Sequence, residues 1–300
     1  MPLVLDRSQV MEIYAAAETK RWVLPAFNSE NLTTTEAVLA AAREFGEVPI
    51  IIGITNTYGH RPQAVYYTHS RDWRVGLRLF LADLRELTGP HSPYRNVPVM
   101  IHLDHIQHDT DAELLGWDLR QFSSIMYDAS TLPMAQNIEQ TAAFRQRWGD
   151  RIIVEGACDE VGEASTSAGV CLTAPEVAER YYRATGVDLI VANLGTEHRA
   201  DAATLQYHGE LAREITRRIG PHLCLHGTSS VPPEQVTRLF DDGVRKVNIW
   251  TALERDSTPA LLADLAKPRT GLWYTTTHRQ EIIFGEMKRI VRQFLELWYQ

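Results

Sequence analysis

Apolar and polar positions follow two alternating periods along this chain. Short apolar runs of strand length recur, and most are followed by a stretch in which apolar residues return every three or four positions, as on one face of a helix. The runs are nearly continuous in apolar character, which is typical of parallel strands buried on both faces. We predict eight strands, at residues 23–28, 48–55, 97–105, 124–128, 151–157, 187–194, 222–226 and 244–250.

The helical stretches fall between and around these runs. The last helix before the sixth strand begins at Thr173-Ala174-Pro175-Glu176, which has the form of a capping box with an early proline. Strands that alternate with helices in this way are typical of an α/β protein, here a (β/α)₈ TIM barrel. The predicted helices are residues 5–20, 33–45, 75–87, 109–122, 137–148 and 173–184.

No composition shift or linker divides the chain, so we expect a single domain over residues 1–300. The barrel is expected at about residues 20–252, followed by extra C-terminal helices at about 253–300. Residues 56–73 are aromatic and polar without a clear period, which predicts a long strand-to-helix loop. The sequence leaves open whether this loop packs on the surface or forms a lid over a substrate.

Residues with metal-binding and proton-transfer chemistry gather at predicted strand ends. The third strand ends in His102-Leu103-Asp104-His105, where alternation places His102 and Asp104 on one face and His105 at the joint of strand and loop. Two later runs also end near glycine in a histidine, His198 and His226. Three histidines from three strands can hold a catalytic Zn²⁺ and leave one coordination position open.

Composition argues against some classes of binding partner but does not indicate the reaction. The 300 residues are 44% hydrophobic and 23% charged, as in ordinary globular proteins, and the net charge of −8 gives no basic patch for nucleic acid or an anionic membrane. No signal peptide or membrane-length apolar run is present, so we expect a cytoplasmic protein. The three cysteines have no disulfide or zinc-site spacing.

Five segments together resemble the class II, metal-dependent ketose-bisphosphate aldolase family, which includes fructose- and tagatose-bisphosphate aldolases. The segments come in the family's order and at comparable spacing, and their combination is specific although each alone is weak. They are Pro25-Ala26-Phe27-Asn28, His102-Leu103-Asp104-His105, Gly195-Thr196-Glu197-His198, Leu225-His226-Gly227-Thr228-Ser229 and Lys246-Val247-Asn248-Ile249.

The resemblance implies a reaction and a metal centre. Zinc would be held by His105, His198 and His226, and Asp104 would exchange a proton with the substrate C4 hydroxyl. The reaction would be reversible retro-aldol cleavage through a metal-stabilised enediolate, with Zn²⁺ or another divalent ion as cofactor. The substrate would be a sugar phosphate or a related keto compound, and the chain would form a homodimer or homotetramer.

Further residues take roles by the same resemblance. His102, Asp128 and Glu155 would support the ligands or contribute to a second metal. The substrate would be bound by Asn28, Arg199, Gly227, Ser229, Asn248 and Thr251.

The chain also departs from the family pattern. The second of two inward glutamates on the fifth strand is Ala157, and the position of the mobile-loop glutamate holds Ser165. We expect Glu163 to take over the second proton transfer, with Glu160 as the alternative. The second carboxylate therefore has to come from a position that the family pattern does not mark.

The substrate-binding segments depart as well. Arg199 stands where the family has glycine, and Trp250 stands where an aspartate or small residue is usual. These changes favour a substrate other than fructose 1,6-bisphosphate, such as a ketose monophosphate or a 2-keto acid held by Arg199. Arg199 could instead face solvent or pair with Asp201.

Two other functions stay open at this point. Lys246 could point into the barrel and form a Schiff base with a carbonyl substrate, or it could form a buried ion pair under the site. The missing glutamate would also fit a metal-binding barrel that has lost aldolase turnover.

Overall fold

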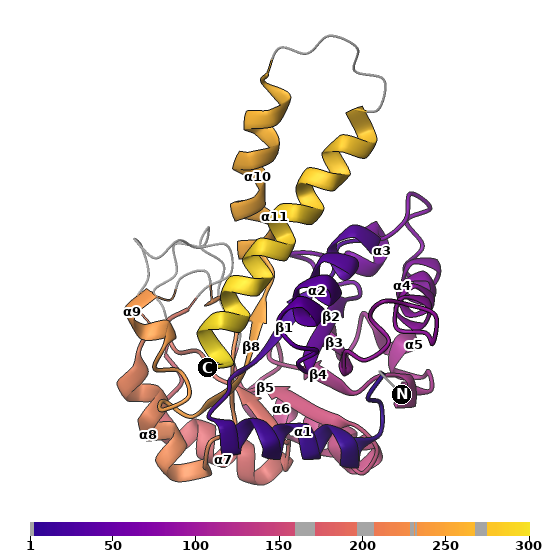
Figure 1. The fold of residues 1–300 in the computed structure, drawn as a ribbon. Coiled ribbons are helices and arrows are strands. Elements are labelled where there is room, and N and C mark those ends of the chain that lie inside the picture. The colour runs from indigo at the N-terminus through magenta and orange to yellow at the C-terminus, as the bar shows by residue number, and fades with distance from the viewer. Residues whose placement is uncertain (1–2, 160–171, 197–206, 229–230, 232, 268–274) are drawn as a thin grey trace.

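A computed structural model describes residues 3–159, 172–196, 207–228, 231, 233–267 and 275–300 of the chain. In this part, eight parallel strands close into one barrel in sequence order, and the last strand pairs with the first (Figure 1). This closed barrel confirms the predicted TIM barrel. The strands are β1 (Leu24–Asn28), β2 (Ile50–Thr55), β3 (Val99–Gln107), β4 (Ser124–Asp128), β5 (Ile153–Ala157), β6 (Leu189–Val191), β7 (Leu223–Leu225) and β8 (Val244–Ile249).

Helices surround the barrel, and a helix such as α4 carries an apolar stripe that is buried in the core. In α4, Leu77, Phe80, Leu81 and Leu84 recur at helical spacing and are at most 3% exposed. Burying one such side chain contributes roughly 1.5–3 kcal/mol relative to leaving it in water. The helices are α1 (Arg7–Lys20), α2 (Leu32–Glu44), α3 (Gln63–Tyr66), α4 (Trp73–Leu87), α5 (Ala112–Leu115), η1 (Leu119–Gln121), α6 (Met134–Trp148), α7 (Pro175–Thr185), α8 (Gly209–Ile219), α9 (Pro233–Val236), α10 (Thr251–Leu265) and α11 (Thr275–Trp298).

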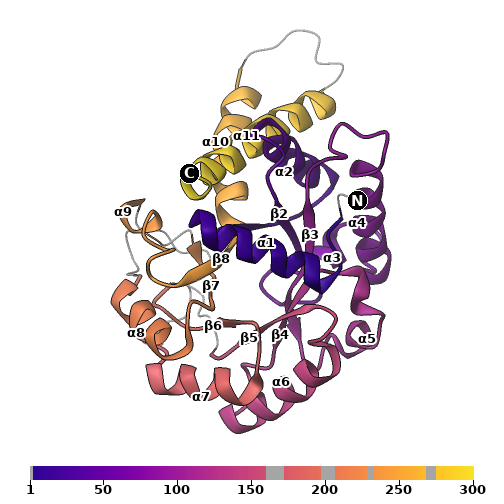
Figure 2. The ribbon, with the colours of Figure 1, turned by 60° about the horizontal axis from the view of Figure 1, so that its bottom comes forward.

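The base of the barrel is closed by α1, which crosses it (Figure 2). Tyr14 of this helix packs against an interior cluster formed by Met126, Ala157, Leu189, Val191 and Cys224. Packed side chains therefore fill the lower interior, as in other barrels of this kind. The polar residues at the carboxyl ends of the strands lie at the opposite end.

The two C-terminal helices extend beyond the barrel mouth (Figure 1). α11 returns to the barrel, where the Phe294 ring lies 6.3 Å from that of Phe27 on β1. Just past its end, Tyr299 stacks on Trp22 at 4.3 Å between ring centroids. None of the helices in the described ranges is both long and apolar enough to cross a membrane.

Two local predictions were wrong in detail. Residues 109–122 form only the short α5 and the 3₁₀ turn η1, not one helix. The capping box at Thr173 is absent, because Ala174 occupies the N-cap position without a side-chain cap. The Thr173 hydroxyl instead donates to Asp159 at 2.6 Å and accepts from the Asn193 N–H at 2.7 Å. A competing tertiary hydrogen bond therefore replaced the local cap.

The third strand also runs further than predicted. β3 continues to Gln107, so His105 lies inside the strand and not at its joint with the loop. The pairing with β4 shifts register between Leu103 and Ile106, and His105 adopts a φ of +47°. Such an irregularity re-aims a side chain within a strand. It is this shift that points both Asp104 and His105 toward the site.

Candidate active site

Two histidine rings meet nearly at right angles at the barrel mouth, with their planes inclined by 85°. His105 Nε2 on β3 lies 3.1 Å from His226 Nδ1, which directly follows β7. The outer nitrogen of each ring meets a buried carboxylate: His105 Nδ1 lies 3.0 Å from Asp128, and His226 Nε2 lies 3.0 Å from Glu155. Carboxylate, imidazole and ion in series is the usual arrangement around a metal-binding histidine.

The tautomers implied by these contacts place two nitrogen lone pairs opposite each other, and a positive charge between them would relieve their repulsion. A carboxylate accepts hydrogen bonds, so the proton of each neutral ring sits on the outer nitrogen of His105 or His226. The two inner nitrogens then present lone pairs to each other at 3.1 Å. Two zinc-bound nitrogens at tetrahedral angles would be about 3.3 Å apart, close to this spacing. The residues therefore fit a divalent ion, and a shared proton is the alternative occupant.

Asp104 is the carboxylate beside this pair. One of its oxygens and one ring nitrogen each of His105 and His226 all lie within 4.8 Å of one another. The amide of Asn28 donates to one Asp104 oxygen at 2.6 Å, and the amide of Asn248 donates to the other at 2.8 Å. Burial would raise the pKa of Asp104, but the neighbouring histidines hold that pKa well below its ordinary value. The group is therefore a fixed, ionised proton acceptor.

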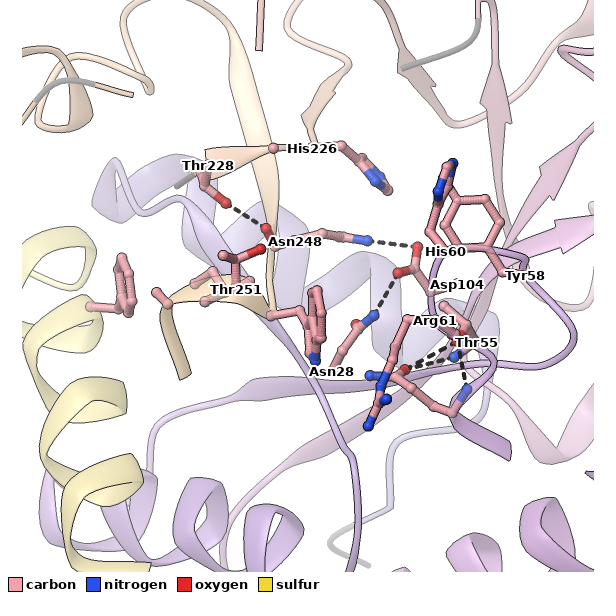
Figure 3. A pocket seen from close by; sticks show the side chains of 16 residues that line it. Asn28, Thr55, Tyr58, His60, Arg61, Asp104, His226, Thr228, Asn248 and Thr251 are labelled. Carbon is pink, nitrogen blue, oxygen red and sulfur yellow. Dashed lines mark hydrogen bonds between the residues drawn. The ribbon is translucent and has the colours of Figure 1, made fainter. Parts of the chain in front are cut away.

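The same contacts show what Asn28 and Asn248 do in this structure. Both were predicted to bind the substrate, and both line the pocket, but their amides hold Asp104 (Figure 3). The Asn248 oxygen also accepts from Lys246 at 2.6 Å. Their binding role remains a prediction.

Lys246 lies beneath the site and is fully buried. Its ammonium donates to Glu155 at 2.8 Å, to Asn248 at 2.6 Å and to His102 Nε2 at 3.2 Å. Burial disfavours the charged form, but the neighbouring anionic groups, Glu155 among them, outweigh it and raise the pKa of Lys246. Lys246 thus forms the buried ion pair that was one of the two roles predicted for it from the sequence.

His102 has both ring nitrogens engaged. Its Nδ1 lies 2.8 Å from the Ser124 hydroxyl and its Nε2 faces Lys246. Burial first, and then the Lys246 charge, lower the pKa of His102, so the ring is neutral. Among the described residues, two groups could hold a metal: Asp104 with His105 and His226, and Glu155 with Cys224 and His226. His102 belongs to neither group. The structure therefore favours a supporting role for His102.

The loop after β2 forms a wall of the site. Tyr58 stacks flat on His105, with ring centroids 4.2 Å apart and planes inclined by 5°. The loop is tied down by Asn56, whose amide donates to Asp111 at 2.8 Å, and by Gln63, whose side chain accepts from the Thr55 N–H at 2.9 Å. These contacts favour the packed reading of residues 56–73 over a lid.

A pocket opens above Asp104 and His226 (Figure 3). Thr251 and Trp250 line it where α10 begins, and Gly227 lines it with a φ of +67°, a backbone region that glycine reaches without strain. Arg61 also lines this pocket, and nothing in the sequence reading singled it out. Its position in the aromatic loop after β2 was the available signal.

Several predicted site residues lie outside the described part of the chain. They are His198, Arg199, Asp201, Ser229 and the loop residues Glu160, Glu163 and Ser165. The described residues thus bring together two of the three predicted zinc ligands, His105 and His226, with Asp104, the carboxylate predicted to transfer a proton. The three residues predicted to support them, His102, Asp128 and Glu155, lie beside them.

Comparison with known proteins places this geometry in a family. The model of the family "Fructose-bisphosphate aldolase class-II" matches residues 8–299. The chain belongs to this family. Membership confirms the resemblance read from the motifs and supports an aldolase activity.

Solved structures of aldolases share the fold. The YdjI aldolase of Escherichia coli K12 superposes with a TM-score of 0.70 at 20% identity, over 96% of each chain. The fructose-bisphosphate aldolase of Campylobacter jejuni superposes with a TM-score of 0.79 at 18% identity, over 99% of this chain and 94% of the other. At these identities the likeness shows the fold alone, so the substrate has to be argued from this chain's own residues.

Proposed function

We propose that this protein is a zinc-dependent class II aldolase that reversibly cleaves a ketose phosphate or a related keto compound. The observation that carries the proposal is the pair of facing nitrogens of His105 and His226 with Asp104 beside them. These two histidines, with His198 by family resemblance, would hold Zn²⁺ or another divalent ion. When bound, the ion would act as a Lewis acid toward the substrate's carbonyl oxygen.

Asp104 would take the proton from the substrate hydroxyl that becomes the aldehyde, and would return it in the addition direction. Its low pKa keeps it ionised, the form that can accept a proton, and Asn28 and Asn248 fix both of its oxygens. Glu163 is proposed for the proton on the other fragment, with Glu160 as the alternative.

The Schiff-base alternative is weaker because of where Lys246 lies. An amine must be neutral and reachable to attack a carbonyl. Lys246 is fully buried, carries a raised pKa and is not part of the pocket wall. We expect no adduct when the enzyme is treated with borohydride in the presence of substrate.

The test is a screen of aldol cleavage with and without a chelator, across ketose monophosphates, ketose bisphosphates and 2-keto compounds. Metal-dependent cleavage of any of them supports the proposal and removes the reading of a barrel that has lost turnover. No cleavage of any compound by the zinc-loaded protein would favour that reading instead.

Asp104→Asn should separate metal binding from proton transfer. The variant should keep its metal and lose roughly 10²-fold or more of its turnover, the usual scale for a lost general acid–base group. Asp109→Asn, which changes an exposed carboxylate in the same segment, is the matched control. Loss of metal from Asp104→Asn, measured by elemental analysis, would make Asp104 a ligand.

The homodimer or homotetramer and the cytoplasmic location remain predictions. Light scattering of the purified chain measures the first, and fractionation of the cell of origin measures the second.

A further inference from the structure

Arg61 is the one lysine or arginine among the described residues that line the pocket. It lies on the Asp104 side of the cavity, together with Thr55 and Asn28, whereas Thr228 and Thr251 lie on the other side (Figure 3). Asp104 is proposed to serve the hydroxyl of the fragment that leaves as an aldehyde. The rest of that fragment would therefore extend toward Arg61.

The guanidinium of Arg61 is held in a fixed orientation from below. Its Nε donates to Glu30 Oε2 at 2.8 Å, and its Nη2 donates to the same oxygen. Gln63 donates to the other oxygen of Glu30 at 2.7 Å, so this carboxylate is itself positioned. Glu30 is 6% exposed, whereas the Arg61 side chain is 35% exposed.

These bonds leave the outer edge of the guanidinium available. An arginine has five N–H groups, and Glu30 accepts only two of them. Nη1 and the second N–H of Nη2 have no acceptor within the described ranges of the chain. These two nitrogens form the fork that binds both oxygens of a carboxylate or phosphate in parallel.

Two aromatic rings fix the same group from the sides. The Arg61 guanidinium carbon lies 5.5 Å from the Tyr66 ring centre and 5.9 Å from that of Trp250. A side chain held by an ion pair and by rings loses little freedom when it binds a ligand, which favours affinity. The bulky Trp250, which departs from the family pattern, thus contacts Arg61.

The surrounding charges leave this arginine able to bind an anion. The hydrogen bonds to Glu30 raise the pKa of Arg61, so the guanidinium stays charged. Burial, and then the negative charge of Glu30, raise the pKa of Glu254, so this second nearby carboxyl is more readily protonated. Charge-assisted bonds from the outer fork are about twice as strong as neutral ones.

We propose that Arg61 binds a phosphate or carboxylate at the far end of the aldehyde fragment and so selects substrates that are anionic at that end. The inference rests on the proposed aldolase function. It adds a specificity residue that the motifs did not contain.

The experiment uses the addition direction with dihydroxyacetone phosphate and three aldehydes that differ only at their far end. Glyceraldehyde carries a hydroxyl there, glyceraldehyde 3-phosphate carries a phosphate, and a third aldehyde of similar length carries a carboxylate. The wild type should prefer one of the two anionic aldehydes, which identifies the anion. Arg61→Gln should lower kcat/KM for that aldehyde by roughly 10- to 100-fold, mainly through KM, because a charged hydrogen bond is lost.

Arg71→Gln is the matched control, since Arg71 also contacts the Tyr66 ring, at 4.1 Å, but does not line the pocket. It should leave all three rates within about twofold. For glyceraldehyde, Arg61→Gln should behave like this control. An equal loss for the neutral and anionic aldehydes, or a wild-type preference for glyceraldehyde, would overturn the proposal.

A second measurement tests anion binding at Arg61 even if the wild type forms no product. Inorganic phosphate is titrated into the zinc-loaded wild type and both variants by calorimetry. Weaker phosphate binding in Arg61→Gln than in Arg71→Gln supports an anion site at Arg61 even though the aldolase proposal fails. Equal binding in the two variants overturns the site.

Discussion

Lys246 shows how one buried side chain ties the two halves of the site together. It donates to Glu155, which holds His226, and to Asn248, which holds Asp104. A single ammonium thus orients, through these partners, both a predicted metal ligand and the carboxylate proposed to transfer a proton. Buried ion pairs of this type contribute little net stability when intact but are costly to break by removing one partner.

Lys246→Met should therefore destabilise the fold by about 3–5 kcal/mol, because it leaves the Glu155 carboxylate buried without its cation. Chemical denaturation measures this loss. The double variant Lys246→Met/Glu155→Gln should recover part of it, since no charge is then stranded. Lys267→Met, at an exposed lysine, is the control and should change stability little. Unchanged stability in Lys246→Met would contradict the role of this ion pair.

At this scale the motifs in the sequence marked residues that the fold brings together, but not the partners of those residues. Asp104, His105 and His226 stand in recognisable motifs at predicted strand ends, and they lie close together in the structure. Arg61 and its support by Glu30 were missed, since nothing in the local pattern links the end of β1 to the loop after β2. The anchoring of Asp104 by two asparagines was also out of reach, because it needs the closed barrel.

Among the elements, α3 and α4 meet at a contact that only glycine allows. A Cβ on Gly76 of α4 would lie 1.9 Å from the carbonyl oxygen of Ala64 in α3. The helix α3 directly follows the loop that carries Tyr58 and Arg61, so this contact packs the end of that loop against α4.

Gly76→Ala should therefore force the helices apart and lower stability by roughly 1–3 kcal/mol, the range for overpacking. Gly285→Ala in α11 is the matched control, because nothing lies within 4 Å of its added Cβ. There the same change should raise stability by up to about 1 kcal/mol through helix propensity. Thermal unfolding of the two variants measures both effects. A stabilised Gly76→Ala would show that this contact is not tight.

Element types were predicted well and element ends less well, for a physical reason. Apolar periodicity reports which residues are buried, and it located all eight strands of the barrel. It carries no information on the register shift in β3, which comes from pairing with β4 and sets the direction of His105. The predicted cap at Thr173 was wrong for a related reason. Its hydroxyl hydrogen-bonds to Asp159, which follows β5, and to Asn193, which follows β6.

In the whole molecule, the predicted ion joins parts of the barrel that are far apart in sequence. His105 and His226 are separated by 121 positions, and their supporting carboxylates come from β4 and β5. The unfolded chain cannot hold these groups together, so an ion that binds them binds the folded state. Binding of this kind stabilises the folded state by mass action, by about 2.7 kcal/mol when the free ion is at 100 times its Kd.

The zinc-loaded protein should therefore unfold several degrees above the chelator-treated protein, and this difference should grow with free zinc concentration. His226→Ala should abolish the difference, because a three-ligand site has no spare donor. His91→Ala, at an exposed histidine, should keep it. Calorimetric scans at several buffered zinc concentrations measure the effect without any substrate. If the zinc-dependent shift in unfolding temperature survives in His226→Ala, the ion binds elsewhere. If the wild type shows no shift, the two histidines share a proton and bind no ion.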